Sequence, residues 1–285
     1  MKIRAKLEPG KVALVTGGSS GIGKAIACHL AERGMDVWLL AQRKDILESA
    51  RKEVETHRTN QSQIIGTISA DVSNLNDVHN AVNLISEKNG PVDLLVNSAG
   101  VTHPGYVQDL DINIFNWMIE VNYYGTVYMT KEVLPAMIKR RSGYIVNICS
   151  LSGEMSTFGY TAYGASKFAV NGFSEALQME LKVLGIGVSI VFPSDTDTPQ
   201  LAYENQFKPP ETRALNSLAG ANQPDDVARY ILKYIERGRY VILPSLETKF
   251  WYHLKSFSLG LCIFITDQVV ASAVKKKNMS ETKKV

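Results

Sequence analysis

Residues 11–23 read KVALVTGGSSGIG, and this stretch decides the fold. Its first six residues are an apolar run typical of a buried strand, and a cluster of glycines follows at once. Gly17 and Gly21 permit a tight turn, and Gly23 lets the next helix pack close to the strand. Such a turn points backbone N–H groups and a helix N-terminus at a phosphate group. We therefore predict a phosphate-binding strand–turn–helix unit, although the glycines alone leave a plain strand–helix turn open.

The rest of the chain repeats this alternation of short apolar runs and longer helical patterns. Strands are expected at residues 11–16, 36–41, 64–70, 92–97, 143–149, 187–192 and 240–243. Helices are expected at residues 22–33, 44–57, 74–88 and 162–184, with two more between 112 and 139. Strands that are buried on both faces and joined by crossover helices form an α/β, doubly wound parallel sheet. We predict a single domain of this kind over residues 10–245.

Two segments depart from the alternation. Residues 193–224 are rich in Pro, Asn, Gln and Thr and follow a strand end, which predicts a substrate loop with one short helix over the site. Residues 246–274 predict an apolar helical extension, and a basic, disordered tail is expected at 275–285. The uncharged run 256–266 has 11 residues, whereas a membrane-spanning helix needs about 20. The alternatives for the extension are a surface-lying membrane helix, an acyl-chain cover, a subunit contact and ordinary core packing.

The composition excludes several classes of function. The net charge is +3, but five lysines and one acid lie after Val274, so the remaining body is close to neutral. This distribution argues against a nucleic-acid partner. The three cysteines have neither disulfide nor metal-ligand spacing, which predicts a reducing compartment and no metal site. Residues 1–10 contain no leader or anchor signal, which predicts a cytoplasmic protein, with peripheral membrane contact through the C-terminal region as the alternative.

The end of the second strand bears on the choice of nucleotide. It reads Ala41-Gln42-Arg43-Lys44, and no acid occurs before Asp45. An acid at the strand end would bind ribose hydroxyls and repel a 2′-phosphate, whereas Arg43 offers a planar fork that suits a phosphate. Ser19 adds a hydrogen-bond donor. A solvated charged turn is the alternative reading, and we predict NADPH as the cofactor.

Three residues suggest the chemistry. Tyr163 and Lys167 lie four positions apart at the start of a strong helical pattern, so they share one helix face. A nearby ammonium favours the phenolate and lowers the pKa of the tyrosine, as proton transfer requires. A surface pair would explain these two residues alone. Ser150, however, follows the strand at 143–149, and the carboxyl ends of strands are where open α/β sheets bind ligands, so its hydroxyl is placed to bind a substrate oxygen.

Taken in order, the motifs resemble the short-chain dehydrogenase/reductase family over roughly residues 10–245. They are TGGSSGIG at 16–23, Asp71-Val72, Asn97-Ser98-Ala99-Gly100, Asn122, Ser150, Tyr163 with Lys167, and Pro193 leading to Thr198. The resemblance implies a Rossmann-type domain that moves a hydride between nicotinamide and a ketone/alcohol pair. Two positions depart from the family pattern: Ser98 replaces a usual Ala or Cys, and Ser194 replaces a usual Gly.

The resemblance also implies a role for each position. Tyr163 is the expected general acid, Lys167 holds the nicotinamide ribose, Ser150 orients the carbonyl, and Asn122 supports a proton relay through Lys167. Asp71 is expected at the adenine, Asn97 and Gly100 at the adenosine ribose, and Thr198 at the carboxamide. The full cofactor set comprises Gly17, Ser19, Ser20, Gly21, Ile22, Gly23, Arg43, Asp71, Val72, Asn97, Gly100, Tyr163, Lys167, Pro193, Thr196 and Thr198.

Runs outside the shared cofactor motifs suggest the substrate. They are FGYTAY at 158–163, ALQME at 176–180, FPSDTDTP at 192–199, Glu204-Asn205 and KPPETR at 208–213. They resemble the branch of the family that reduces the 3-ketone of a long-chain amino alcohol in sphingoid-base synthesis, which implies a long-chain amino ketone substrate. Asp195, Asp197 or Glu204 is a candidate partner for its ammonium group, with loop capping by Asp and Thr as the alternative.

Other readings remain open at this point. A related reductase for a steroid, retinoid or 3-ketoacyl substrate would keep the same motifs. A non-catalytic NADP-binding sensor or scaffold would not need the full set of Ser150, Tyr163 and Lys167. The family resemblance implies a homo-oligomer built on the helix at 162–184. Cys149 is expected in the core, because strand alternation turns it away from Ser150, and His103 is interpreted as a loop histidine.

Overall fold

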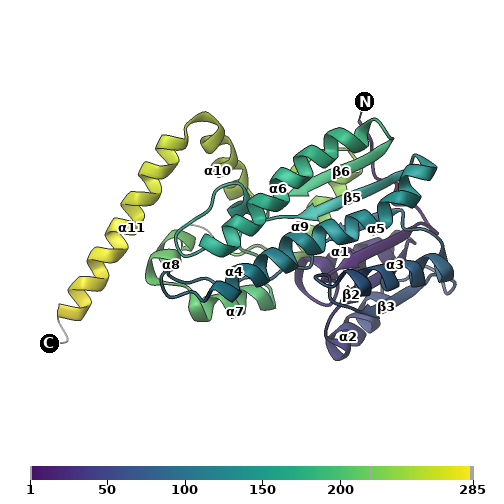
Figure 1. Cartoon of the computed structure of the whole chain (residues 1–285), viewed down its shortest axis with the longest axis horizontal. Coiled ribbons are helices and arrows are strands. Elements are labelled where there is room, and N and C mark those ends of the chain that lie inside the picture. The colour runs from purple at the N-terminus through teal and green to yellow at the C-terminus, as the bar shows by residue number, and fades with distance from the viewer. Residues whose placement is uncertain (1, 218–219, 283–285) are drawn as a thin grey trace.

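The computed structural model describes residues 2–217 and 220–282, and seven parallel strands form one sheet at its centre (Figure 1). The spatial order is β3-β2-β1-β4-β5-β6-β7. The strands are β1 (Val12–Thr16), β2 (Asp36–Ala41), β3 (Ile65–Ser69), β4 (Leu94–Asn97), β5 (Gly143–Ile148), β6 (Ile186–Val191) and β7 (Val241–Ile242). This architecture confirms the predicted doubly wound α/β sheet.

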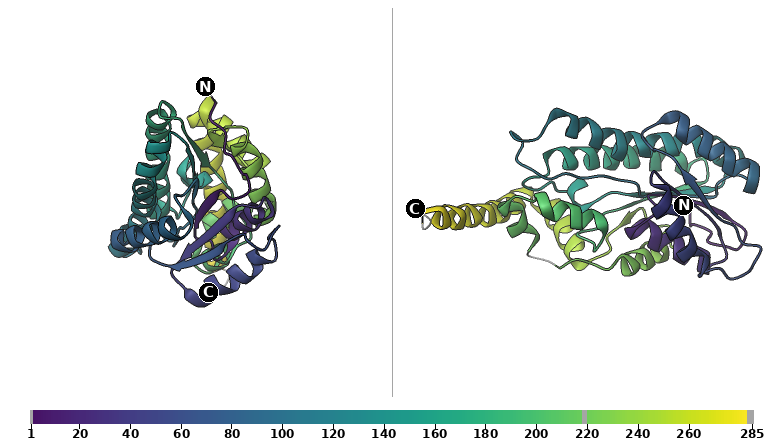
Figure 2. Two further views of the ribbon diagram at one scale, coloured as in Figure 1. Left: turned by 90° about the vertical axis from the view of Figure 1, so that its right-hand side faces the viewer. Right: turned by 90° about the horizontal axis from the view of Figure 1, so that it is seen from below.

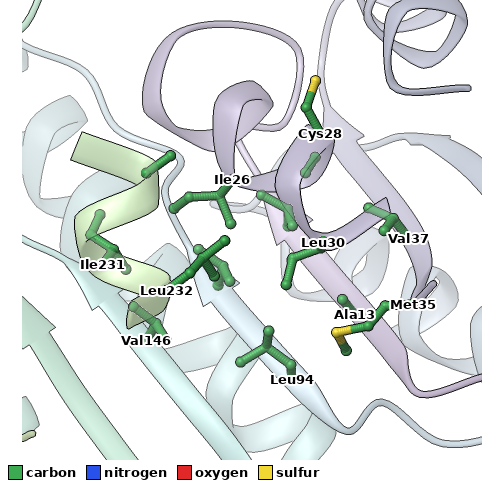
Figure 3. Close-up of a cluster of buried hydrophobic side chains, with 14 of the residues drawn as sticks. Ala13, Ile26, Cys28, Leu30, Met35, Val37, Leu94, Val146, Ile231 and Leu232 are labelled. Atoms are coloured by element: carbon green, nitrogen blue, oxygen red, sulfur yellow. The ribbon is translucent and has the colours of Figure 1, made fainter. Parts of the chain in front are cut away.

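Helices cover both faces of the sheet. One face packs against α1 (Gly21–Glu32), α2 (Lys44–Glu55) and α9 (Pro224–Ile235), as Figure 3 shows for part of this layer. The other face packs against α3 (Leu75–Asn89), α5 (Gly125–Arg140) and α6 (Thr161–Lys182). The three-layer arrangement explains why the strands are mostly apolar, because both faces of the sheet are covered by helices.

Strand β1 illustrates how the sequence builds these two cores. Ala13 and Val15 belong to the cluster beneath α1 and α9, whereas Val12 and Leu14 belong to the cluster beneath α3 and α5. Successive side chains of a strand point to opposite faces, so one apolar run supplies both cores. In Figure 3, Ile26 of α1 lies on the side of Ile231 and Leu232 of α9, and Leu30 of α1 lies closer to Ala13 of β1.

The strand order places the site. Strand β1 pairs with β2 on one side and with β4 on the other, so the chain changes direction across the sheet at β1. The gap above the carboxyl ends at such a switch point is where doubly wound sheets bind ligands. The two helical stretches expected before β5 lie end to end as α4 (Ile112–Met118) and α5, joined by a π-helical turn at Ile119–Tyr124.

Residues 193–216, which we call the lid, contain two helices instead of the one short helix expected from the sequence. They are α7 (Pro199–Phe207) and α8 (Pro210–Asn216). The Thr198 hydroxyl accepts a hydrogen bond from Leu201 N at 3.3 Å and caps α7. Each helix has a proline in its first turn, where the missing N–H costs nothing. The prolines that suggested a loop therefore start two helices.

The chain ends in α10 (Leu246–Phe257) and α11 (Leu259–Thr282). Helix α11 packs against α8 and then extends beyond the body (Figure 2, right). A disordered tail was expected from residue 275, but α11 continues to Thr282, since its alanines and lysines favour a helix; residues 283–285 lie outside the described part. None of the described helices has the length and hydropathy needed to cross a bilayer.

Candidate active site

A cavity of about 700 Å³ lies above the carboxyl ends of the strands and beneath the lid. Most of the residues predicted from the sequence line it: Gly17, Ser19, Ser20, Gly21, Ile22, Arg43, Val72, Gly100, Ser150, Tyr163, Lys167, Pro193, Thr196 and Thr198. The structure thus brings together residues from Gly17 to Thr198, which are far apart in the sequence. Gly23, Asp71, Asn97 and Asn122 are not part of the cavity wall.

The glycine turn is packed so closely against neighbouring backbone that it has no room for side chains. A Cβ on Gly17, where φ is +64°, would lie 2.7 Å from Ser98 O, and a Cβ on Gly23 would lie 2.5 Å from Gly17 O. Gly21 has φ +55° and faces the Thr198 methyl group, so the turn touches the start of the lid. Ser20 precedes α1 without a side-chain cap, which leaves the first N–H groups of the helix for a ligand. These features fit a phosphate group.

Two predicted cofactor residues have other partners. The Asp71 carboxylate accepts hydrogen bonds from the backbone N and the hydroxyl of Ser73, at 2.8 and 2.7 Å. Asn97 is buried, and its Nδ2 donates to Asn147 Oδ1 at 2.9 Å. Asn97 therefore ties β4 to β5, and it does not line the cavity. The sequence motif placed it correctly at a strand end, but the side chain points into the sheet layer.

Ser150, Tyr163 and Lys167 face one another across the carboxyl end of β5. Ser150 follows the strand, and its Oγ accepts a hydrogen bond from Ser152 N at 3.1 Å. Tyr163 and Lys167 lie one turn apart in α6, with Lys167 Nζ 5.8 Å from the centre of the tyrosine ring. Lys167 Nζ also donates to Ile148 O at 3.1 Å, which fixes the ammonium beside the strand end.

Burial dominates the ionisation of this group. It raises the pKa of Tyr163, the Glu204 charge raises it further, and a hydrogen bond with Ser150 lowers it. Burial also lowers the pKa of Lys167. The sequence-based expectation was a lowered pKa for Tyr163, whereas the balance in this structure is a raised one, because the loss of hydration disfavours the charged form of a buried residue. Burial therefore favours the neutral, protonated form of Tyr163.

Asn122 is positioned by the π-helical turn. Its Oδ1 accepts from Val101 N at 2.8 Å, and its Nδ2 donates to Ser166 Oγ at 2.8 Å. A Cβ on Gly100 would lie 3.2 Å from Asn122 Oδ1 and 3.5 Å from Lys167 Nζ, so the two side chains flank the same glycine. A π turn widens a helix locally and is frequent at functional sites. Here it brings Asn122 behind Lys167.

Cys149 and His103, for which the sequence predicted no role in the chemistry, have different surroundings. Cys149 is buried, as expected, and burial raises the pKa of its thiol to about 11, which keeps it unreactive. His103 is more than a loop residue. Its Nδ1 lies 2.8 Å from the Tyr203 hydroxyl, and its ring packs 4.5 Å from that of Phe207. His103 therefore joins the lid to the loop after β4.

Two contacts between a tyrosine and a carboxylate also hold the lid, and neither was predicted from the sequence. The Tyr160 hydroxyl donates to Glu204 Oε2 at 2.6 Å, and the Tyr106 hydroxyl donates to Glu211 Oε2 at 2.9 Å. Both carboxylates are buried. The partners are 44 and 105 residues apart in sequence, so no local pattern links them. Only the position of Glu204 in the substrate loop marked it in advance.

The profile of the short chain dehydrogenase family matches residues 11–209 of this chain. With the fold and the cavity described above, this match shows that the chain belongs to that family and is an oxidoreductase.

Individual relatives are more specific. The 3-ketodihydrosphingosine reductase of Bos taurus is 43% identical over 81% of this chain and 70% of its own length. The 3-dehydrosphinganine reductase of Danio rerio is 43% identical over 80% and 69%. Among solved structures, a short-chain dehydrogenase/reductase of Burkholderia phymatum in complex with NAD has a TM-score of 0.79 and 26% identity, over 90% of this chain and 96% of its own. A short-chain dehydrogenase of Sphingobium yanoikuyae in complex with NADPH has a TM-score of 0.74 and 26% identity, over 88% and 95%.

Proposed function

We propose that this protein uses NADPH to reduce the ketone of 3-ketodihydrosphingosine, a long-chain 2-amino-3-ketone, to the alcohol. The observation that carries this proposal is the meeting of Ser150, Tyr163 and Lys167 in one cavity, in a chain whose relatives bear the name of that activity. The retained set also disfavours a non-catalytic NADP-binding scaffold, which has no use for a buried proton donor.

Each of the proposed catalytic residues has a separate role in the reduction. NADPH, when bound, supplies the hydride that adds to the carbonyl carbon. The Ser150 hydroxyl binds the carbonyl oxygen, and the Tyr163 hydroxyl gives its proton to that oxygen as charge develops there. Lys167 holds a positive charge near the tyrosine, which stabilises the phenolate left after proton transfer. Asn122 supports the return of a proton towards Lys167.

The proposed choice of NADPH rests on the end of β2. Arg43 is exposed at the edge of the cavity, and no acidic side chain follows β2 before Asp45. A guanidinium there can bind a 2′-phosphate through two parallel hydrogen bonds. The tight, side-chain-free turn at Gly17 and the uncapped start of α1 suit the pyrophosphate. Val72, Gly100 and Thr196 complete the proposed walls of the nucleotide site.

The direct test is NADPH oxidation by the purified protein with 3-ketodihydrosphingosine in mixed micelles. NADH and a short-chain ketone are run beside it. Rapid, NADPH-selective loss of nicotinamide absorbance with the amino ketone is the expected result. Turnover of another ketone alone would discard the sphingoid substrate and keep the Tyr163 chemistry, and equal use of NADH would discard the role of Arg43.

The proposal extends to peripheral membrane contact through α11. Leu261, Ile263 and Phe264 are 42%, 50% and 59% exposed, and Lys275 and Lys276 follow on the same helix. An exposed apolar run beside lysines suits the surface of an anionic membrane. Helix α11 also packs on α8, next to the cavity that would receive a lipid-like substrate. Sedimentation with anionic vesicles tests the contact, and a protein that stays entirely in the supernatant would refute it.

We also propose a homo-oligomer that uses the exposed side of α6. Phe168, Met179 and Val183 are 40%, 61% and 73% exposed on this helix or directly after it. Apolar side chains gathered on one helix are typical of a subunit contact. Light scattering of the purified protein distinguishes a dimer or tetramer from a monomer.

A further inference from the structure

Glu204 is a buried carboxylate in the wall of the cavity. Its exposed fraction is 7%, and it lines the same cavity as Ser150 and Tyr163. The Tyr160 hydroxyl donates to Glu204 Oε2 at 2.6 Å, and the rings of Tyr160 and Tyr163 lie 5.7 Å apart, centre to centre. Tyr160 therefore contacts both the carboxylate and the ring of the proposed proton donor.

The two oxygens of Glu204 have different surroundings. Oε2 accepts the Tyr160 hydrogen bond and lies 3.8 Å from Lys208 Nζ. Oε1 accepts one hydrogen bond, from Gln200 Nε2 at 3.2 Å, and a carboxylate oxygen has lone pairs for a second donor. Lys208 is shared, because its Nζ also lies 3.2 Å from Asp195 Oδ2. Two carboxylates thus divide one ammonium, which leaves this end of the cavity negative.

Other carboxylates nearby are less suited to a cationic substrate group. Asp195 Oδ2 accepts from Asn216 Nδ2 at 2.9 Å in addition to Lys208, and its side chain is 37% exposed against 9% for that of Glu204, so water screens the charge of Asp195 more. Asp197 does not line the cavity. Glu247 of α10 lines it but bonds to Ser194, and it is not among the charges that act on Tyr163, whereas Glu204 is. Asp195 also raises the pKa of Tyr163, but Glu204 raises it more, so Glu204 is the carboxylate with the larger effect on the reacting group.

We infer that Glu204 is a specificity-determining residue that binds the ammonium group of the substrate, an inference that rests on the proposed reduction of a 2-amino-3-ketone. The ammonium and the ketone of such a substrate are on adjacent carbon atoms. A ketone held by Ser150 and Tyr163 therefore brings the ammonium to the wall that contains Glu204. Burial raises the pKa of Glu204, and an arriving cation favours its ionised form, so substrate charge and protein charge compensate each other inside the cavity.

The experiment compares two ketones in three proteins. The ketones are the long-chain 2-amino-3-ketone and the same long-chain 3-ketone without the amino group. The proteins are the natural chain, Glu204→Gln and Glu211→Gln. Glu211 is the matched control, because it is also a buried lid carboxylate that accepts a tyrosine hydrogen bond, but it does not line the cavity. Glutamine keeps the shape and an acceptor oxygen while it removes the charge.

The natural chain and Glu211→Gln are expected to prefer the amino ketone in kcat/KM. In Glu204→Gln this preference falls about 10- to 100-fold, as expected for a lost hydrogen bond between charged groups, while the amine-free ketone is still reduced. An unchanged preference in Glu204→Gln, or an equal loss in Glu211→Gln, overturns the inference and leaves the proposed function intact. A natural chain that reduces only the amine-free ketone overturns both. Far-ultraviolet circular dichroism checks that each variant is folded.

Discussion

The floor and the lid of the cavity are built by different means. The floor, which consists of the glycine turn at 16–23 and the residues around Ser150 and Tyr163, is fixed by backbone geometry and by strands buried on both faces. The lid is held by contacts between side chains, such as Tyr160–Glu204 and His103–Tyr203. The backbone of the floor holds the same shape whichever substrate binds. The side chains of the lid can be changed one at a time by substitution without altering that shape. The difference suggests that the floor determines the chemistry and the lid selects the substrate.

The largest expected effect is on the floor. Tyr163→Phe removes one hydroxyl and with it the proposed proton donor, and kcat should fall about 100- to 10,000-fold for every ketone tested. Affinity for NADPH, measured by nicotinamide fluorescence, should stay close to that of the natural chain. If turnover survives the substitution, the proton comes from another group. The claim that the floor determines the chemistry through Tyr163 would then be wrong.

A second change on the floor addresses the nucleotide. Arg43→Ala should weaken NADPH binding about 10- to 100-fold, because a charged hydrogen-bonded partner of the proposed 2′-phosphate is lost. NADH lacks this phosphate, so its binding should change little. Isothermal titration of both nucleotides measures the contrast. Equal losses for the two nucleotides would mean that Arg43 contacts a part of the cofactor that both share, or that it acts only through its positive charge at the edge of the cavity.

The third prediction separates backbone strain from a steric clash. Gly17→Ala forces a Cβ to 2.7 Å from Ser98 O at φ +64°, whereas Gly10→Ala has a similar φ of +74° and nothing within 4 Å of its Cβ. Both should lower the free energy of unfolding by about 1–2 kcal/mol through the left-handed backbone. In Gly17→Ala, overpacking should lower the free energy of unfolding by about 1–3 kcal/mol more. Denaturant titrations of both variants measure the difference. Equal losses would mean that the floor tolerates the side chain.

The same contrast explains how much could be predicted from the sequence. The floor was predictable because its signals are local: an apolar run ending in glycines, and a tyrosine and lysine one helical turn apart. The number of lid helices and the partners of Glu204 were not, because they depend on contacts between residues such as Tyr160 and Glu204 that are distant in the chain. Asp71 and Asn97 show a further limit, since a motif fixes the position of a residue but not its side-chain partners, which here are Ser73 and Asn147.

The smallest expected effect connects the lid to the floor. The Glu204 charge raises the pKa of Tyr163, so Glu204→Gln should lower that pKa. Reduction needs the protonated tyrosine and is lost as pH rises through its pKa; the decline in kcat should therefore begin at a lower pH in the variant. Oxidation of the alcohol needs the phenolate, so its rate should rise at a lower pH as well.

The amine-free ketone and its alcohol are the substrates for this measurement, because ammonium recognition then plays no part in the profile. Glu211→Gln is again the control, since Glu211 is not among the charges that act on Tyr163. Parallel shifts of both profiles to lower pH in Glu204→Gln alone would show that the lid charge acts on the proton donor. A shift to higher pH would have the wrong sign for the loss of a negative charge, and matching profiles in the two variants would mean that the lid acts on the substrate and not on the floor.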